Sequence, residues 1–180
     1  MERPIIGKKI KDFKFEAYCS IKDEIVEKNL ISNEKWTLIM FYPKDFTFVC
    51  PTELKALSAM KPEFKEIDTR VISFSTQDNQ SHKDWTEADL GKMNFPMGYD
   101  KNGEIGEYFG VYDKENDVDW RGTFLIAPDG RLWASYILAD ETGRSVKEML
   151  RFVKAGQNSY AGKMVPCEWT PGVEFLKKPE

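Results

Sequence analysis

Histidine and cysteine are scarce in this chain, which contains one histidine and three cysteines in 180 residues. The histidine, His82, has no cysteine or carboxylate at metal-ligand spacing, and neither His-Glu-x-x-His nor Cys-x-x-Cys occurs. We therefore expect no metal or other cofactor, and we interpret His82 as a structural residue. Gly103, Gly106 and Gly110 do not form a Gly-x-Gly-x-x-Gly pattern after a buried strand, so no dinucleotide site is expected.

Long apolar runs and blocks of one charge sign are also missing. Lysine and arginine number 26, aspartate and glutamate number 30, and the net charge of -4 is spread along the chain. We expect neither nucleic acid nor a membrane as a partner. Residues 1–9 lack the apolar core of a signal peptide, and no run is long enough to cross a bilayer, so we expect a cytoplasmic protein.

The three cysteines, Cys19, Cys50 and Cys167, are odd in number and widely separated. In a reducing compartment this pattern favours catalytic or redox roles over structural bridges. Cys19 has no helix start, basic neighbour or second cysteine close by, and we interpret it as a small, half-buried apolar residue.

The composition provides enough material for one core, with 41% hydrophobic and 13% aromatic residues. Apolar runs rich in β-branched and aromatic residues predict buried strands at 36–42, 70–75, 122–127 and 132–138. The last two form a hairpin across Pro128-Asp129-Gly130. We also expect a strand or hairpin at 9–18 and a short strand at 95–99. Polar residues 20–33 and acidic residues 113–119 are interpreted as surface segments.

Helical patterns alternate with these strands. They predict helices at 51–67, broken or kinked near 59–61 by Pro62, at 78–90, at 102–109 ending at Gly110, and at 145–155 with Ser145 as N-cap. The order of elements predicts an α/β domain with a mixed central sheet flanked by helices. We assign residues 1–155 to this domain and residues 156–180 to a C-terminal tail.

Cys50 is the candidate nucleophile, because it lies where a buried strand ends and a helix begins. Pro51 suits the first turn of a helix, where its missing N–H costs nothing. Cys50 would then face unpaired N–H groups and the positive end of the helix dipole, an environment that favours the thiolate, the reactive form of cysteine. The alternative is a buried, inert cysteine.

Two neighbours make this loop resemble a site. Thr47 lies three residues before Cys50 and can bring a hydroxyl beside the sulfur, while Pro43 stiffens the loop. The pattern Pro43-x-x-x-Thr47-x-x-Cys50, with Phe41-Tyr42 before it and Pro51-Thr52-Glu53-Leu54 after it, resembles the peroxiredoxins, and within them the typical 2-Cys group that includes the peroxidase subunit of alkyl hydroperoxide reductase.

The resemblance covers about residues 4–175 and implies a thioredoxin-like fold. It also implies a thiol peroxidase in which Cys50 attacks hydrogen peroxide or an organic hydroperoxide and becomes a sulfenic acid. By the Arg-Gly-x-Phe match, Arg121 would reach the cysteine, whereas spacing alone favours a solvated or ion-paired role. Glu53 and Arg144 would form a supporting polar pair, although capping or surface roles fit the sequence as well.

Cys167 lies between prolines in a segment with little core pattern. The run Val165-Pro166-Cys167-Glu168-Trp169 is close to the motif of the family's resolving cysteine, whereas a lone tail cysteine could also be incidental. The resemblance implies a disulfide between Cys50 and Cys167 of two subunits, hence a homodimer, with rings of five dimers common. An outside reductant, thioredoxin or a flavoprotein disulfide reductase, would restore the thiols.

Two family features linked to easy overoxidation are missing from the sequence. Ala88-Asp89-Leu90-Gly91 stands where some members have Gly-Gly-Leu-Gly, and no Tyr-Phe helix follows Cys167. We expect a comparatively robust enzyme. Two rival functions remain: a protein thiol–disulfide oxidoreductase, which the lack of Cys-x-x-Cys disfavours, and a redox-switched chaperone or assembly protein.

Overall fold

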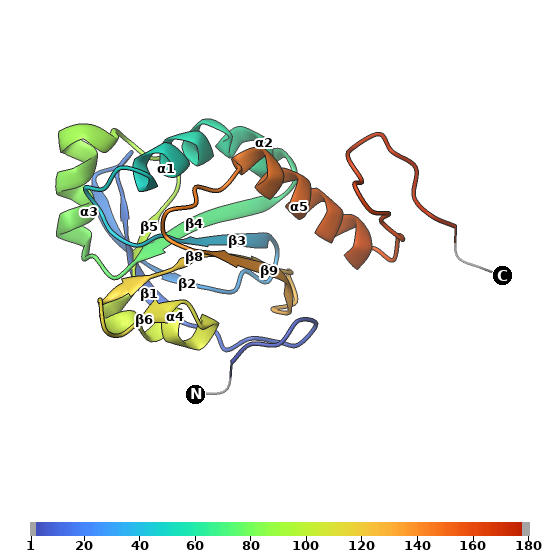
Figure 1. Ribbon diagram of the computed structural model, residues 1–180, viewed down its shortest axis with the longest axis horizontal. Helices are drawn as coiled ribbons and strands as arrows, with labels where there is room; N and C mark the ends of the chain where they lie inside the picture. The colour runs from blue at the N-terminus through green and yellow to red at the C-terminus, as the bar shows by residue number, and fades with distance from the viewer. Residues whose placement is uncertain (1–2, 178–180) are drawn as a thin grey trace.

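The computed structural model describes residues 3–177 and has a mixed sheet of seven strands in the order β2-β1-β5-β4-β3-β8-β9 (Figure 1). The strands are β1 (Lys14–Cys19), β2 (Glu24–Asn29), β3 (Trp36–Phe41), β4 (Thr69–Ser75), β5 (Met97–Tyr99), β8 (Arg121–Ile126) and β9 (Leu132–Leu138). The central strands β3, β4 and β5 run parallel, and β1, β8 and β9 pair antiparallel with their neighbours. This arrangement confirms the predicted mixed sheet.

Helices cover both faces of the sheet (Figure 1). They are α1 (Cys50–Ala59), α2 (Lys61–Glu66), α3 (Asn79–Trp85), which continues as the π-helix Thr86–Leu90, α4 (Glu104–Phe109), preceded by the 3-10 turn Lys101–Gly103, and α5 (Val146–Tyr160). The break predicted near Pro62 is confirmed, because α1 ends at Ala59 and α2 begins at Lys61 with the proline in its first turn.

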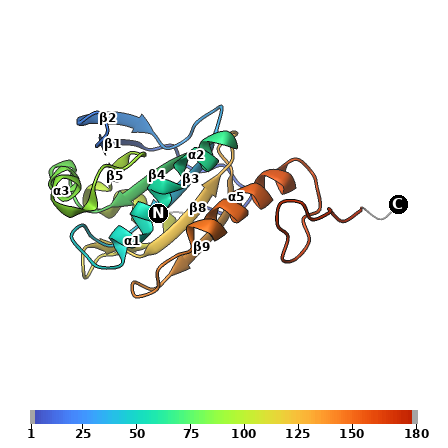
Figure 2. The ribbon, with the colours of Figure 1, turned by 90° about the horizontal axis from the view of Figure 1, so that it is seen from above.

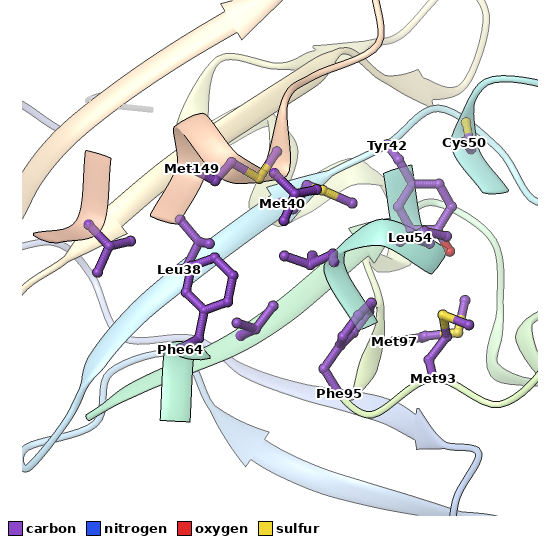
Figure 3. Packing of buried hydrophobic residues seen from close by; sticks show 14 of the residues in the cluster. Leu38, Met40, Tyr42, Cys50, Leu54, Phe64, Met93, Phe95, Met97 and Met149 are labelled. Carbon is purple, nitrogen blue, oxygen red and sulfur yellow. The ribbon is translucent and has the colours of Figure 1, made fainter. Parts of the chain in front are cut away.

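Every residue of β3 is buried, since apolar clusters lie on both sides of this strand. Leu38 and Met40 face the cluster formed with α1, α2 and α5, part of which Figure 3 shows. Ile39 and Phe41 face the cluster formed with α4. Side chains of a strand alternate between faces, so a central strand covered on both sides reads as a continuous apolar run. This is why the sequence located β3 so clearly.

Two stretches differ from the prediction. Residues 20–33 contain β2, whose polar composition hid it: β2 is an edge strand in which four of the six residues are exposed. Residues 112–119 form a short ribbon of β6 (Tyr112–Asp113) and β7 (Val118–Asp119), in which Asp119 is completely buried. Residues 114–117 are exposed, as predicted, but the surface assignment was wrong for Val118 and Asp119.

The C-terminal segment 161–177 lies beyond the end of α5, away from the rest of the molecule (Figure 2). Helix α5 runs to Tyr160, five residues further than predicted, because its apolar face continues to pack on the sheet. The segment is closed by a bridge between Met164 and Leu176, and the buried Trp169 donates its indole N–H to Val173 O at 2.9 Å. The division into a domain and a tail at residue 155 stays a prediction.

Candidate active site

Cys50 is the first residue of α1, directly after the loop that leaves β3. The preceding Val49 is the N-cap residue and Pro51 occupies the first turn, as the sequence predicted. The thiol is completely buried, and Figure 3 places it at the margin of the apolar cluster, near the Tyr42 ring. A buried thiol needs a specific polar partner to ionise, because burial alone favours the uncharged form.

Arg121 supplies that partner. It begins β8, and its Nη1 donates to Cys50 Sγ at 3.4 Å and to Glu53 Oε2 at 2.8 Å. Its Nε donates to Asp140 O at 2.6 Å, which fixes the guanidinium plane. Burial by itself would lower the pKa of Arg121, but the contacts with Cys50 and Glu53 outweigh it and raise that pKa. A permanent positive charge therefore lies beside the thiol.

Glu53 links this arginine to a second one. The carboxylate lies one helical turn after Cys50, on the same face of α1. Glu53 Oε1 accepts from Arg144 N at 2.6 Å and Nε at 2.9 Å, and Oε2 accepts from Arg144 Nη2 at 2.9 Å. Burial raises the pKa of Glu53, but the bonds from Arg144 and the charge of Arg121 lower it by more, so the net shift is downward.

The ion-paired cluster contains two cations and one anion, and the charge of Arg121 also acts on the nearby Asp140 carboxyl group. Glu53, Arg121 and Arg144 are all buried, and two guanidinium groups face one carboxylate. Arg144 Nη1 donates to Gly122 O and Thr123 Oγ1, which are uncharged. The guanidinium of Arg121 is thus placed to donate charge-assisted hydrogen bonds to negative charge at the Cys50 sulfur or on a reacting oxygen next to it.

Pro43 and Thr47 lie in the loop between β3 and α1. Pro43 is buried, and Thr47 is half-buried with its hydroxyl donating to Lys44 O at 3.1 Å. The hydroxyl oxygen keeps its lone pairs, so it can still accept a hydrogen bond from a peroxide. The placement of Thr47 beside the sulfur stays a prediction.

The sequence analysis missed Asp45. Its buried carboxylate lies between Pro43 and Thr47 and accepts from Tyr42 Oη, Ser81 Oγ and His82, each at 2.8 Å. A charged residue in a polar loop carries no signal of burial. His82 was the one hint, since a single histidine followed three residues later by the fully buried Trp85 marks an inward-facing side of α3.

The other two cysteines are placed differently. Cys167 is exposed in the segment after α5, and both ribbon views put that segment on the side away from the start of α1 (Figures 1 and 2). The fold thus does not bring Cys167 to Cys50 within one chain. Cys19, at the end of β1, is half-buried as predicted, and burial raises the pKa of its thiol, which disfavours the reactive thiolate.

Within residues 3–177, no group of three or more histidine, cysteine, aspartate or glutamate side chains is arranged to hold a metal ion. In that same part of the chain, no helix has the length and apolarity required to cross a membrane.

Comparison with known proteins identifies the family. The model of the AhpC/TSA family matches residues 6–135. Alkyl hydroperoxide reductase C of Amphibacillus xylanus is 37% identical over 96% of this chain and 94% of its own length. The selenocysteine-containing peroxiredoxin PrxU of Peptoclostridium acidaminophilum is 38% identical over 96% of this chain and 88% of its own length.

A solved structure agrees with this relationship. The reduced 2-Cys peroxiredoxin of Plasmodium vivax superposes with a TM-score of 0.90 at 29% identity, covering 96% of this chain and 92% of that one. The thioredoxin-like fold implied by the sequence motifs is thereby confirmed. The chain therefore belongs to the AhpC/TSA family, and it is a peroxiredoxin, an enzyme that reduces peroxides with a cysteine thiol.

Proposed function

We propose that Cys50 is the peroxidatic cysteine of this enzyme. Its thiolate attacks one oxygen of the peroxide, the O–O bond breaks, and the departing oxygen takes a proton to leave as water or an alcohol. Cys50 is oxidised to the sulfenic acid while the peroxide is reduced. The main support is the 3.4 Å contact from Arg121 Nη1 to Cys50 Sγ within a buried cluster of two cations and one anion.

Arg121 and Thr47 orient the peroxide in this proposal. The guanidinium stabilises both the attacking thiolate and the negative charge that develops on the departing oxygen. The Thr47 hydroxyl accepts from the peroxide, and Pro43 keeps the loop rigid without adding an unpaired N–H. Glu53 and Arg144 hold Arg121 in place through the buried ion pairs.

Cys167 of a second subunit resolves the sulfenic acid. Its thiol attacks the Cys50 sulfur, a disulfide forms, and the hydroxyl leaves as water. Support comes from the exposed position of Cys167 on the side of the chain away from α1 (Figure 2), which favours pairing between subunits over pairing within one. The working unit would be a homodimer, assembling further into a decamer.

Regeneration requires a dithiol protein from outside. Thioredoxin or a flavoprotein disulfide reductase would attack the disulfide at the exposed Cys167 sulfur, in a reducing cytoplasm, and restore both thiols. No step in this cycle calls for a bound cofactor.

The decisive test compares peroxide consumption with dithiothreitol for the wild type, Cys50→Ser and Cys167→Ser, with Cys19→Ser as the matched control. After one equivalent of peroxide, non-reducing gels should show a disulfide-linked dimer for the wild type and Cys19→Ser only. Cys50→Ser should be inactive. Full activity of Cys50→Ser would disprove the assignment, and insulin reduction faster than peroxide consumption would favour a thiol–disulfide oxidoreductase.

A further inference from the structure

Asp45 is the most heavily bonded side chain of the loop that precedes Cys50. Its carboxylate is buried, with 5% of the residue exposed, and accepts three hydrogen bonds from side chains. Tyr42 Oη donates to Oδ1, and Ser81 Oγ and His82 Nδ1 contact Oδ2; each of the three distances is 2.8 Å. Burying a carboxylate in this way is costly, and apolar packing would often stabilise a fold equally well.

Two of these partners belong to α3, which is itself fixed on the sheet. Asp78 caps the helix by accepting from Ser81 N at 2.8 Å. The second ring nitrogen of His82 faces Gly98 O on β5 at 3.4 Å. The Asp45 carboxylate thus ties the loop to an element that the sheet already holds, and the loop gains a fixed point 37 residues away in the sequence.

The residue after Asp45 adopts a strained backbone conformation. Phe46 has φ of +54°, a region that non-glycine residues rarely occupy without compensation from their surroundings. Its ring lies 6.0 Å from the buried Trp85 ring of α3, while 55% of the residue remains exposed. Helix α3 thus contacts two neighbouring residues of the loop: Trp85 packs near the Phe46 ring, and Ser81 and His82 bind the Asp45 carboxylate.

Thr47 follows immediately, so its position depends on this turn. Its hydroxyl donates to Lys44 O, which closes the four residues from Lys44 to Thr47 into one unit. The unit has a buried anchor at Asp45 and a strained hinge at Phe46. If the anchor is lost, the strain at Phe46 can relax, and Thr47 moves with it.

We propose that Asp45, Ser81 and His82 are positioning residues for the peroxide reaction: they fix the Lys44–Thr47 turn and thereby orient the Thr47 hydroxyl toward peroxide at Cys50. This inference rests on the proposed roles of Cys50 and Thr47. It assigns α3 a task in catalysis even though none of its side chains touches the sulfur.

The test measures the second-order rate constant of Cys50 oxidation by hydrogen peroxide in a Cys167→Ser background. Ser81→Ala removes one donor and leaves the core intact, and Asp45→Asn removes the charge at constant size. A displacement of about 1 Å at a reacting group can cost about a hundredfold in rate. We expect a loss of about tenfold for Ser81→Ala and about a hundredfold for Asp45→Asn.

Two controls separate positioning from stability. Ser20→Ala removes a buried hydroxyl in the turn after β1, which bonds Met93 N at 2.8 Å and Met93 O at 3.2 Å and lies far from the loop in sequence. It should lower the thermal midpoint without changing the peroxide rate constant. Alkylation of Cys50 by iodoacetamide, which needs the thiolate but not Thr47, should proceed at the wild-type rate in Ser81→Ala and Asp45→Asn.

A double-mutant cycle tests whether the effect passes through Thr47. In a Thr47→Val background, Ser81→Ala should cause no further loss of peroxide rate. The inference is overturned if Ser81→Ala leaves the peroxide rate unchanged, if alkylation falls in parallel, or if the two losses simply multiply. Failure of the Cys50 assignment would be recognised separately, because Cys50→Ser would then keep its activity.

Discussion

Two groups of buried ionisable side chains in this protein differ in their partners. The first joins Glu53 to Arg121 and Arg144, and both carboxylate oxygens receive donors from arginine. The second consists of Asp100 and Asp119, each completely buried. Asp100 accepts from the backbone N–H groups of α4, whereas the Asp119 oxygens have no hydrogen-bond partner within residues 3–177.

The two groups show opposite pKa shifts for carboxylates buried to a similar degree. The arginines lower the pKa of Glu53 against the effect of burial. Burial, with the nearby Glu104 and Asp117, raises the pKa of Asp100 to about 6. Burial, with the charges of Asp100 and Asp117, raises the pKa of Asp119 to about 9. Among carboxyl groups that are all buried, the partners thus decide whether the pKa falls or rises.

The missing side chain of Gly106 leaves room for the carboxyl groups of Asp100 and Asp119. A methyl group at Gly106 would collide with Asp119 Oδ1 and approach Asp100 Oδ2 to 2.9 Å. Both carboxyl groups thus converge on one α4 residue without a side chain. In the proposed function the cluster of Glu53, Arg121 and Arg144 serves chemistry at Cys50, whereas Asp100 and Asp119 pack where α4 meets the β6–β7 ribbon, and Asp119 lies two residues before Arg121.

The largest expected effect comes from removing one cation from the charged cluster. Arg121→Met deprives Cys50 of its contact with a guanidinium and leaves Glu53 with Arg144. Losing a preorganised charge of this kind typically costs about 100- to 1,000-fold in rate. We expect that loss in the rate constant of Cys50 oxidation by peroxide, measured by stopped-flow fluorescence.

The control for this variant is Arg131→Met, which removes an arginine paired with Asp129 at the surface. It should leave the peroxide rate within about twofold of the wild type. Equal rates for Arg121→Met and Arg131→Met would show that the buried cluster contributes nothing to catalysis.

The next effect concerns pH. Because the folded-state pKa of Asp119 lies above its unfolded value, its contribution to stability is complete below about pH 4 and declines as the pH rises toward 9. Each pH unit in this window changes the unfolding constant by at most about tenfold. Between pH 6 and 8 we expect wild-type stability, from urea unfolding, to fall relative to Asp119→Asn by at most about a hundredfold in that constant.

Asp119→Asn keeps the size of the side chain and cannot ionise, so it isolates this titration. Asp129→Asn, at a half-buried aspartate whose pKa is lowered by Arg131, serves as the comparison and should follow the wild type between pH 6 and 8. Parallel curves for the wild type and Asp119→Asn would mean that Asp119 does not hold its proton in the folded state.

Filling the space at Gly106 should have an intermediate effect. Gly106→Ala forces a methyl group into the Asp119 carboxyl group, and overpacking of this kind costs about 1–3 kcal/mol. The loss should shrink when Asp119→Ala is combined with it, which differential scanning calorimetry can measure. If the two substitutions are additive, the carboxyl group is not what limits the space.

The smallest effect is expected at Glu104, an exposed residue close to Asp100. Glu104 contributes to the raised pKa of Asp100 and bonds Lys11 at 3.3 Å, with both side chains more than half exposed. Exposed ion pairs contribute about 0–1 kcal/mol. Glu104→Gln should therefore change the free energy of unfolding by less than about 0.5 kcal/mol. A change comparable to that of Gly106→Ala would show that Glu104 belongs to the buried network.

The strands and helices that the sequence located are those determined by features of a few neighbouring residues, such as an apolar run, a proline or a helix cap. β3 is a continuous apolar run, the Pro62 break follows from the missing N–H, and Ser145 caps α5 by accepting from Glu148 N at 3.2 Å. β2 was missed because the exposed residues of an edge strand are polar. Asp119 was misplaced because a charged residue in an acidic stretch carries no local sign that it is buried.

The candidate site divides in the same way. The spacing of Cys50 and Glu53 puts both on one face of α1, and this follows from helical geometry alone. Arg121 and Arg144 were named only through the resemblance to a family. Arg121 lies 71 residues after Cys50, and Arg144 lies 91 residues after Glu53, so no local pattern connects them. The anchor at Asp45 was not foreseen at all.

Local sequence thus set the order of elements, the start of α1 at Cys50 and the hairpin of β8 and β9, because backbone preference and side-chain period act over a few residues. Only the tertiary structure decided which charges are paired: it joined β8 and the start of α5 to α1, tied Asp45 to α3, and left Asp119 without a cation. Burial and ionic partners come from segments distant in the chain, so no local pattern can encode them.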